Sequence, residues 1–169
     1  MEYAHRAGVR KFIFASTGGV YPDSGEVFTE STPIIPAGIR DFYSATKLSS
    51  EILLQATAGQ IDLTVLRIFF AYGPGQREDM LIPRLVSRVR DGVPVTLHGR
   101  EGFRLNPVHV SDVVRSIEAS LSLTGMHTIN VAGPEAYTLS QIASVIGDHV
   151  GREPLFDFEE EGSGPEALV

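Results

Sequence analysis

Apolar residues along the chain form short continuous runs that alternate with longer amphipathic stretches. The runs at residues 11–16 and 63–70 are rich in β-branched and aromatic side chains, which is typical of strands buried on both faces. Between them, apolar residues recur at steps of three and four across residues 42–58, and this spacing predicts a helix. Strand, helix and strand in this order indicate a βαβ unit with a parallel sheet.

The second half of the chain continues the alternation with shorter strands. Thr138 and Gln141 form a capping-box pair before one predicted helix, and Ser111 is placed to cap another. The tail from residue 153 holds six acids and no base, so we expect it either to fray or to pack on a part of the fold that is missing from this chain. The predicted helices cover residues 80–90, 112–123 and 139–150, and the predicted short strands cover residues 94–97, 107–110 and 127–131.

Composition and charge exclude several classes of protein. The 169 residues carry 21 acids and 14 bases, a net charge of −7 with neutral histidines, which argues against binding to nucleic acid. The lack of cysteine excludes disulfides and thiolate chemistry, and the five histidines lack metal-ligand spacing, so no metal site is expected. No apolar run approaches the ~20 residues of a membrane span, and no secretory signal is visible, so the expected location is the cytoplasm.

Two groups of residues suggest acid–base chemistry. Tyr43 and Lys47 stand four apart on the predicted helix, so their side chains share one face. An ammonium beside a phenol favours the phenolate, and such a tyrosine can donate or accept a proton near neutral pH. Ser16 and Thr17 end the first strand, where open α/β sheets place their ligand chemistry. Taken alone, the tyrosine–lysine pair is also what an ordinary amphipathic helix edge provides.

These residues belong to an ordered set of motifs that resembles the extended short-chain dehydrogenases/reductases and, within them, the nucleotide-sugar epimerase/dehydratase group. The resemblance covers roughly residues 5–150. It is carried by FASTGGVY at 14–21, YSATK at 43–47, LRIFFAYGPG at 66–75, PVTLHG at 94–99, VHVSDV at 108–113 and NVAG at 130–133, together with Arg104.

The resemblance implies a role for each matching residue. Tyr43 would be the catalytic acid/base, Thr17 the catalytic hydroxyl, and Lys47 the lysine that tunes the phenol and holds the nicotinamide ribose. The implied reaction removes a sugar hydroxyl proton while hydride passes to NAD or NADP, and the rotated keto sugar is then reduced from its other face. The implied cofactor-binding residues are Ser16, Tyr43, Lys47 and Phe69, and the implied substrate-binding residues are Thr17, Gly18, Phe70, Met80, Leu97 and Arg104.

Departures from the family pattern narrow this interpretation. Gly18 and Gly19 stand where dehydratases of the group carry an Asp–Glu pair, and a dehydratase needs an acid to protonate the departing hydroxyl, so the glycines argue against that branch. Phe70 and Met80 stand where many epimerases carry asparagine, and their apolar side chains favour core positions over ligand contacts. The resemblance implies that Arg104 would bind the nucleotide diphosphate, because the paired N–H donors of its guanidinium match phosphate oxygens. The alternative is that Arg104 is a solvated surface arginine.

The implied fold is α/β, a partial Rossmann-like parallel sheet with flanking helices and a small C-terminal substrate-binding portion. Residues 1–75 would form the second part of the dinucleotide-binding domain and residues 76–169 mainly the substrate-binding portion, with residues 107–132 returning to the Rossmann sheet. The Gly-rich turn that holds a dinucleotide pyrophosphate is absent from the sequence. We therefore expect a chain that begins partway through the cofactor fold, with the strands at 11–16 and 63–70 lacking neighbours.

The leading hypothesis is an epimerase-like oxidoreductase that acts on a nucleotide sugar with NAD or NADP. By analogy with the family, a homodimer would form through the helix that carries Tyr43. Two alternatives stay open. One is a reductase of the same family that acts on a keto sugar or another carbonyl, and the other is a non-catalytic remnant or interaction module, which the missing Gly-rich turn suggests.

Overall fold

The computed structural model describes residues 2–22, 27–39, 41–56 and 59–160, and these form an α/β structure in two compact units. Unit 1 comprises Met1–Ala71 and Val108–Ala132, and unit 2 comprises Tyr72–Pro107 and Gly133–Val169. Two short strands, β3 (Ala71–Tyr72) and β6 (Val108–His109), lie where the chain passes from one unit to the other.

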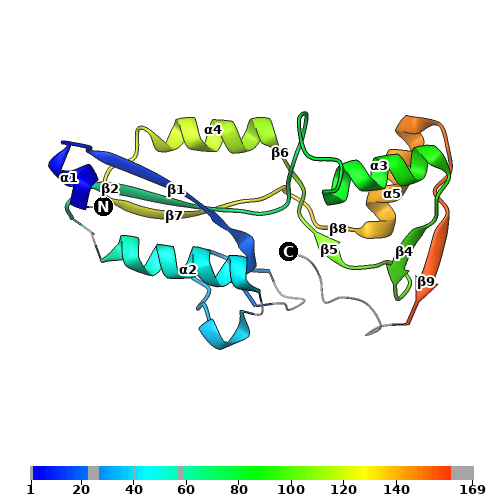
Figure 1. The fold of residues 1–169 in the computed structure, drawn as a ribbon, viewed down its shortest axis with the longest axis horizontal. Helices are drawn as coiled ribbons and strands as arrows, with labels where there is room; N and C mark the ends of the chain where they lie inside the picture. Colours follow the sequence, from blue (N-terminus) through cyan, green and yellow to red (C-terminus); the bar gives the residue numbers. More distant parts are fainter. Residues whose placement is uncertain (1, 23–26, 40, 57–58, 161–169) are drawn as a thin grey trace. The chain divides into compact units, whose positions relative to one another are not determined.

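Unit 1 is built on a parallel sheet of three strands in the order β1 (Lys11–Thr17), β2 (Asp62–Ile68) and β7 (Met126–Val131), as Figure 1 shows. The predicted strands and their parallel arrangement are confirmed. The expectation that the strand at 63–70 lacks neighbours is wrong, because β2 is the central strand and pairs with β1 on one side and β7 on the other.

Two helices cover the sheet of unit 1 on opposite faces, α2 (Phe42–Gln55) and α4 (Val110–Ser120) (Figure 1). Residues 57 and 58 of the predicted helix lie outside the described residues. The predicted cap at Ser111 is wrong, since α4 starts at Val110 and the imidazole Nδ1 of His109 accepts the backbone N–H of Ser111 at 3.3 Å. A short helix, α1 (Glu2–Arg6), precedes β1, and two 3-10 turns, η1 (Gly18–Val20) and η2 (Pro36–Gly38), precede α2.

The central strand β2 is buried on both faces, which explains its largely apolar sequence. On one face Leu63 and Val65 of β2 pack with Leu54 of α2. On the other face Leu66 packs with residues of α4 and β7. The buried members of the second cluster are Leu66, Val108, Val113 and Val131.

Unit 2 combines two helices with two small strand pairs. The helices α3 (Leu81–Asp91) and α5 (Leu139–Val150) pack together, and the predicted capping box of Thr138 and Gln141 at the start of α5 is confirmed. The short strands form an antiparallel pair, β5 (Arg104–Leu105) with β8 (Tyr137–Thr138), and a parallel pair, β4 (Val95–His98) with β9 (Phe156–Glu159).

The strand β9 corrects the prediction that the acidic tail frays from residue 153. The backbone N–H groups of Val95 and Gly99 donate to the carbonyls of Leu155 and Glu159 at 2.8 and 2.9 Å, and these bonds hold the segment against β4. Residues 161–169 of the tail lie outside the described residues. In the part of the chain that the structure describes, no helix is long and apolar enough to cross a membrane.

Candidate functional site

The helix α2 carries three polar side chains at steps of four residues, Tyr43, Lys47 and Glu51. The helix begins where the carboxylate of Asp41 accepts the backbone N–H of Ser44 at 2.7 Å, which satisfies one of the free donors of the first turn. Residues four apart share one face of a helix, and α2 packs against β1 and η1. The stripe is therefore presented to the carboxyl end of β1.

Lys47 joins this helix to the end of β1. Its Nζ donates to the carbonyl of Ala15 at 2.8 Å and lies 5.1 Å from the ring centre of Phe14 and 5.5 Å from that of Tyr43. The Tyr43 side chain is 52% exposed. The structure thus brings the predicted tyrosine and lysine together, with the phenol open to a ligand.

Thr17 and Gly18 begin the tight turn that follows β1. The Thr17 hydroxyl oxygen accepts the backbone N–H of Gly19 at 3.2 Å and so caps η1. Gly18 is needed here for its lack of a side chain, because a Cβ atom at this position would lie 2.5 Å from the ring of Phe69. The Phe69 ring is also stacked on Tyr21, with 6.1 Å between centroids. Four predicted residues, Ser16, Thr17, Gly18 and Phe69, therefore meet at the carboxyl ends of β1 and β2.

A buried ionic network lies next to this turn, and none of its charged residues was among the predicted site residues. Glu51 is 1% exposed and Arg67 is 5% exposed, and Arg67 Nη2 lies 2.8 Å from Glu51 Oε2. The Ser16 hydroxyl donates to Glu51, and Arg67 Nη1 donates to the Tyr21 hydroxyl at 2.8 Å. Burial lowers the pKa of Arg67, but the hydrogen bonds with Glu51 and Tyr21 outweigh it and raise the pKa above its ordinary value.

Two signals in the sequence could have revealed this network. Glu51 continues the step of four residues from Tyr43 and Lys47, and Arg67 is a charged residue within an otherwise apolar strand. A charge in a buried strand needs a partner. Ser16, for which a cofactor contact was predicted, has its hydroxyl hydrogen-bonded to Glu51.

The remaining predicted substrate residues occupy varied environments. Phe70 is half-buried after β2. Met80 is 46% exposed at the N-cap of α3, so the expectation that it is a core residue is wrong. Leu97 on β4 is 1% exposed, which makes its side chain a core residue of unit 2. Arg104 on β5 is exposed, and its Nη2 donates to the carbonyl of Ala136 at 3.5 Å.

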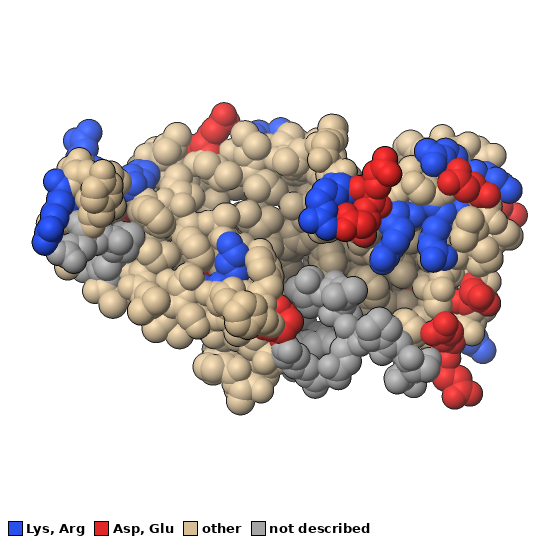
Figure 2. All heavy atoms as spheres, in the orientation of Figure 1, with Lys and Arg blue, Asp and Glu red and all other residues tan. Residues whose placement is uncertain are grey.

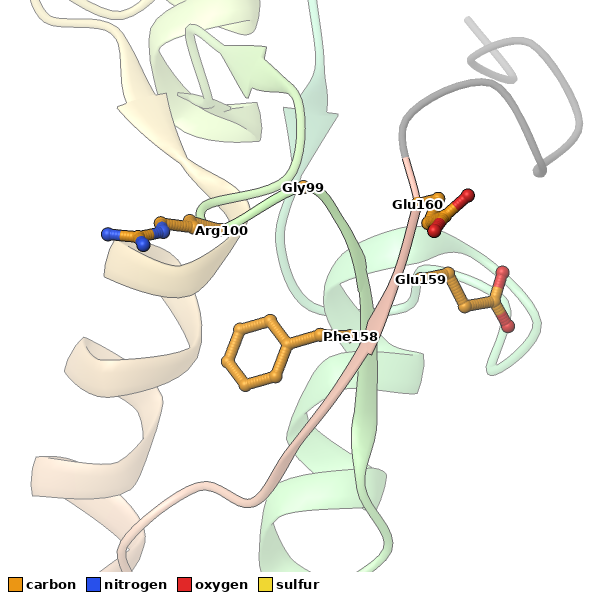
Figure 3. Close-up of a pocket in the computed structure, with 5 residues that line it drawn as sticks. All are labelled: Gly99, Arg100, Phe158, Glu159 and Glu160. Carbon is orange, nitrogen blue, oxygen red and sulfur yellow. The ribbon is translucent and has the colours of Figure 1, made fainter.

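Unit 2 has an open cavity of about 580 Å³ at the ends of β4 and β9. Figure 3 shows Phe158 and Arg100 projecting to one side of this strand pair and the carboxylates of Glu159 and Glu160 to the other. Its lining includes Gly99, the last residue of the family motif at 94–99. None of the individually predicted site residues lines it. A second cavity of about 280 Å³ in unit 1 lies over the Glu51–Arg67 pair.

Charged side chains are distributed differently on the two units. On the face in Figure 2, acidic and basic side chains are interspersed over unit 2, whereas most of the unit 1 surface is uncharged. Unit 1 instead buries Glu51 and Arg67 beneath its surface. Among the described residues, no group of three histidine, aspartate or glutamate side chains could hold a metal ion.

A parallel sheet covered by helices on both faces defines an α/β protein of the Rossmann-like class, and a tyrosine and a lysine four residues apart lie at the carboxyl end of one of its strands. The sequence model of the NAD dependent epimerase/dehydratase family matches residues 1–132, and the chain belongs to this family. The predictions of the family and of its fold class are confirmed.

The relatives of this chain are enzymes of nucleotide-sugar chemistry. It is 30% identical over 168 residues to an uncharacterised UDP-glucose epimerase of Bacillus subtilis, and the match covers 97% of this chain and 52% of that protein. It is 28% identical over 160 residues to a dTDP-4-dehydro-6-deoxyglucose reductase of Escherichia coli, and this match covers 90% of this chain and 50% of the reductase. The solved structure of MoeE5 with UDP-glucuronic acid and NAD superposes with a TM-score of 0.81 at 31% sequence identity, and the match covers 95% of this chain and 55% of the MoeE5 chain. The chain spans about half the length of these relatives.

Proposed function

We propose that the protein acts as an NAD-dependent epimerase on a nucleotide sugar, with Tyr43 as the acid/base and Lys47 and Thr17 as its partners. The observation that carries this proposal is the half-exposed Tyr43 phenol beside the Lys47 ammonium at the carboxyl end of β1. Ligands of open α/β sheets bind at this end of the strands. The family and the UDP-sugar and NAD ligands of the MoeE5 structure support the choice of substrate and cofactor.

The residues present fit the nicotinamide end of the cofactor. An ammonium has three N–H donors, and the hydrogen bond to Ala15 leaves Lys47 with donor capacity for a ribose hydroxyl. When bound, NAD would supply the acceptor and donor of a hydride for the sugar carbon. Tyr43 would remove the proton of the sugar hydroxyl and later give it back, while the Lys47 ammonium stabilises the phenolate.

Thr17 is suited to orient the same sugar oxygen. A hydroxyl has one donor and two acceptor sites, and Thr17 already accepts the N–H of Gly19. Its own O–H is therefore directed to a different acceptor. A substrate oxygen in that place would receive one hydrogen bond from Thr17 while it exchanges its proton with Tyr43.

The close packing of Gly18 on Phe69 argues against dehydration. A dehydratase would need a carboxylic acid at about this position, but any side chain at residue 18 would collide with the aromatic ring of Phe69. An epimerase needs no such acid. We therefore place the protein with the epimerases of its family, and keep as a second candidate a reductase of a keto sugar, to which the Escherichia coli relative points.

The test is a product assay with the purified protein. We expect UDP-glucose or UDP-glucuronate with catalytic NAD to yield the C4 epimer, seen by proton NMR, without accumulation of NADH. Stoichiometric oxidation of NADH on a 4-keto sugar nucleotide, without epimer formation, would favour the reductase. The absence of specific NAD binding in a calorimetric titration would favour the non-catalytic alternative.

A further inference from the structure

A row of polar side chains crosses the sheet of unit 1 just before its strands end. In the strand register Ser16 of β1 lies opposite Arg67 of β2, and Arg67 lies opposite Asn130 of β7. The Tyr21 hydroxyl closes the row, because it accepts from Arg67 Nη1 at 2.8 Å and lies 2.9 Å from Asn130 Oδ1. The next residue of β1 is Thr17.

Glu51 ties this row to the helix α2. Its carboxylate accepts a hydrogen bond from the Ser16 hydroxyl, one from Arg67 Nε at 3.2 Å and one from Arg67 Nη2 at 2.8 Å. One turn earlier on the same face of α2, Lys47 donates to the carbonyl of Ala15. Successive residues of β1, Ala15 and Ser16, are thus fastened to successive turns of the helix that carries Tyr43.

Stability alone does not account for a buried ion pair at this place. Removing two charges from water costs several kcal/mol per ion, and well-packed apolar residues of similar size are often as stable or more stable. A charge-assisted, two-point contact does supply directional specificity that apolar packing lacks. Such specificity is useful where two elements must hold reacting groups in register.

We propose that Glu51 is a positioning residue, which through Ser16 and Arg67 fixes the Thr17 hydroxyl relative to Tyr43 and Lys47. The effect on turnover rests on the proposed function. Glu51 touches neither substrate nor cofactor in this proposal. Its role is to set the distance between the end of β1 and the face of α2 that carries Tyr43 and Lys47.

The first test separates positioning from folding by comparing two variants. Glu51→Gln is expected to lower kcat about 100-fold, the size of effect that a small misplacement of reacting groups produces, with KM within about threefold of the original value. The double variant E51M/R67M leaves no unpaired buried charge, so its Tm should recover while its kcat stays low. Recovery of kcat together with Tm would show a purely structural pair and overturn the proposal.

A matched control comes from the neighbouring residue of α2. The Ser50 hydroxyl donates to the carbonyl of Thr46 at 2.9 Å, a hydrogen bond within α2 itself. Ser50→Ala removes one hydrogen bond from the same helix turn and should keep both kcat and Tm. If Glu51→Gln does not fold, the comparison of E51M/R67M with Ser50→Ala decides the question.

A second measurement does not depend on turnover. Amide hydrogen exchange of the full chain should show the Gly19 N–H, which Thr17 accepts, exchanging at least about tenfold faster in E51M/R67M, with the amides of α4 unchanged. Unchanged exchange at Gly19 would overturn the proposal. If the unsubstituted protein shows no turnover on any nucleotide sugar, the proposed function fails, and this exchange measurement alone judges the role of Glu51.

Discussion

The phenol of Tyr43 is the single group on which the proposed chemistry depends. It is half-exposed and lies beside the ammonium of Lys47. Tyr43→Phe removes the proton carrier and keeps the ring, so turnover should fall by roughly 10²–10⁴-fold while NAD affinity by calorimetry is retained. Tyr3→Phe, which changes an 85% exposed tyrosine of α1, is the matched control and should keep full turnover. Undiminished activity of Tyr43→Phe would refute the assignment.

The close packing of Gly18 predicts that adding one methyl group at this position lowers the free energy of unfolding. The Cβ of Gly18→Ala would lie 2.5 Å from the Phe69 ring, and such overpacking costs about 1–3 kcal/mol of unfolding free energy. Gly38→Ala is the control, because its nearest neighbour would be Pro22 Cβ at an ordinary 3.7 Å.

Urea unfolding of the two glycine variants measures the difference. Trimming the ring in the double variant Gly18→Ala/Phe69→Leu should restore part of the loss, since the colliding atoms belong to the ring. Equal stability of Gly18→Ala and Gly38→Ala would mean that the turn relaxes without cost, and would weaken the argument against a carboxylate at position 18.

At the scale of elements, local patterns were sufficient to locate several single helices and strands. The helix α5 follows from periodicity and from the Thr138 capping box, which involve near neighbours in the chain, and the strands β1 and β2 follow from their continuous apolar runs. The cap of α4 was misassigned because imidazole can accept an N–H as serine does. The strand β9 was missed because its pairing with β4 joins residues about sixty apart. The acidic residues of this segment favour an unstructured tail, and no local pattern outweighs that tendency.

The segment at residues 29–30 shows how a loop is held to the sheet edge. The Glu30 carboxylate accepts the backbone N–H of Asn130 on β7 at 2.7 Å. This hydrogen bond holds the pKa of Glu30 below its ordinary value. A depressed pKa in the folded state adds stability above the unfolded pKa, near about 4.3, and that stability is lost as the pH falls through the folded value.

Glu30→Gln should therefore destabilise the protein modestly and in a pH-dependent way. Because Glu30 is exposed, the loss at pH 7 should be only about 0.5 kcal/mol. The difference in Tm between the original and Glu30→Gln should shrink as the pH is lowered from neutrality to about 3. A constant difference over this range would show that the carboxylate charge makes no contribution.

At the scale of the whole molecule, the sequence motifs identified the family but not the contacts within the candidate site. The order of segments gave the family, Lys47 lies beside Tyr43, and Thr17 is the last residue of β1. The network of Glu51, Arg67 and Tyr21 arises from the register of β1 on β2 and from α2 lying across both. Such a register is a property of the assembled sheet, so the periodicity of one segment cannot predict it.

The division into two units leads to a prediction about how variants affect kinetics. Unit 1 holds the proposed proton chemistry, whereas exposed Arg104 of unit 2 is the proposed contact of the nucleotide diphosphate. Loss of a hydrogen bond between charged groups costs about 1.5–3 kcal/mol, so Arg104→Gln should raise KM for the nucleotide sugar at least about tenfold. Its kcat should change little, because the phosphates are bound equally in the ground and transition states.

The control for Arg104→Gln is Arg84→Gln, which removes an exposed arginine of α3 in the same unit. It matches the change in net charge, so any general electrostatic effect on an anionic substrate appears in both variants and cancels in their comparison. Steady-state kinetics with UDP-glucose or UDP-glucuronate should then show the rise in KM for Arg104→Gln alone. A fall in kcat at unchanged KM would instead place Arg104 among the groups that act on the reacting sugar. Equal kinetics of the two variants would show that Arg104 is a solvated surface arginine that does not bind the substrate.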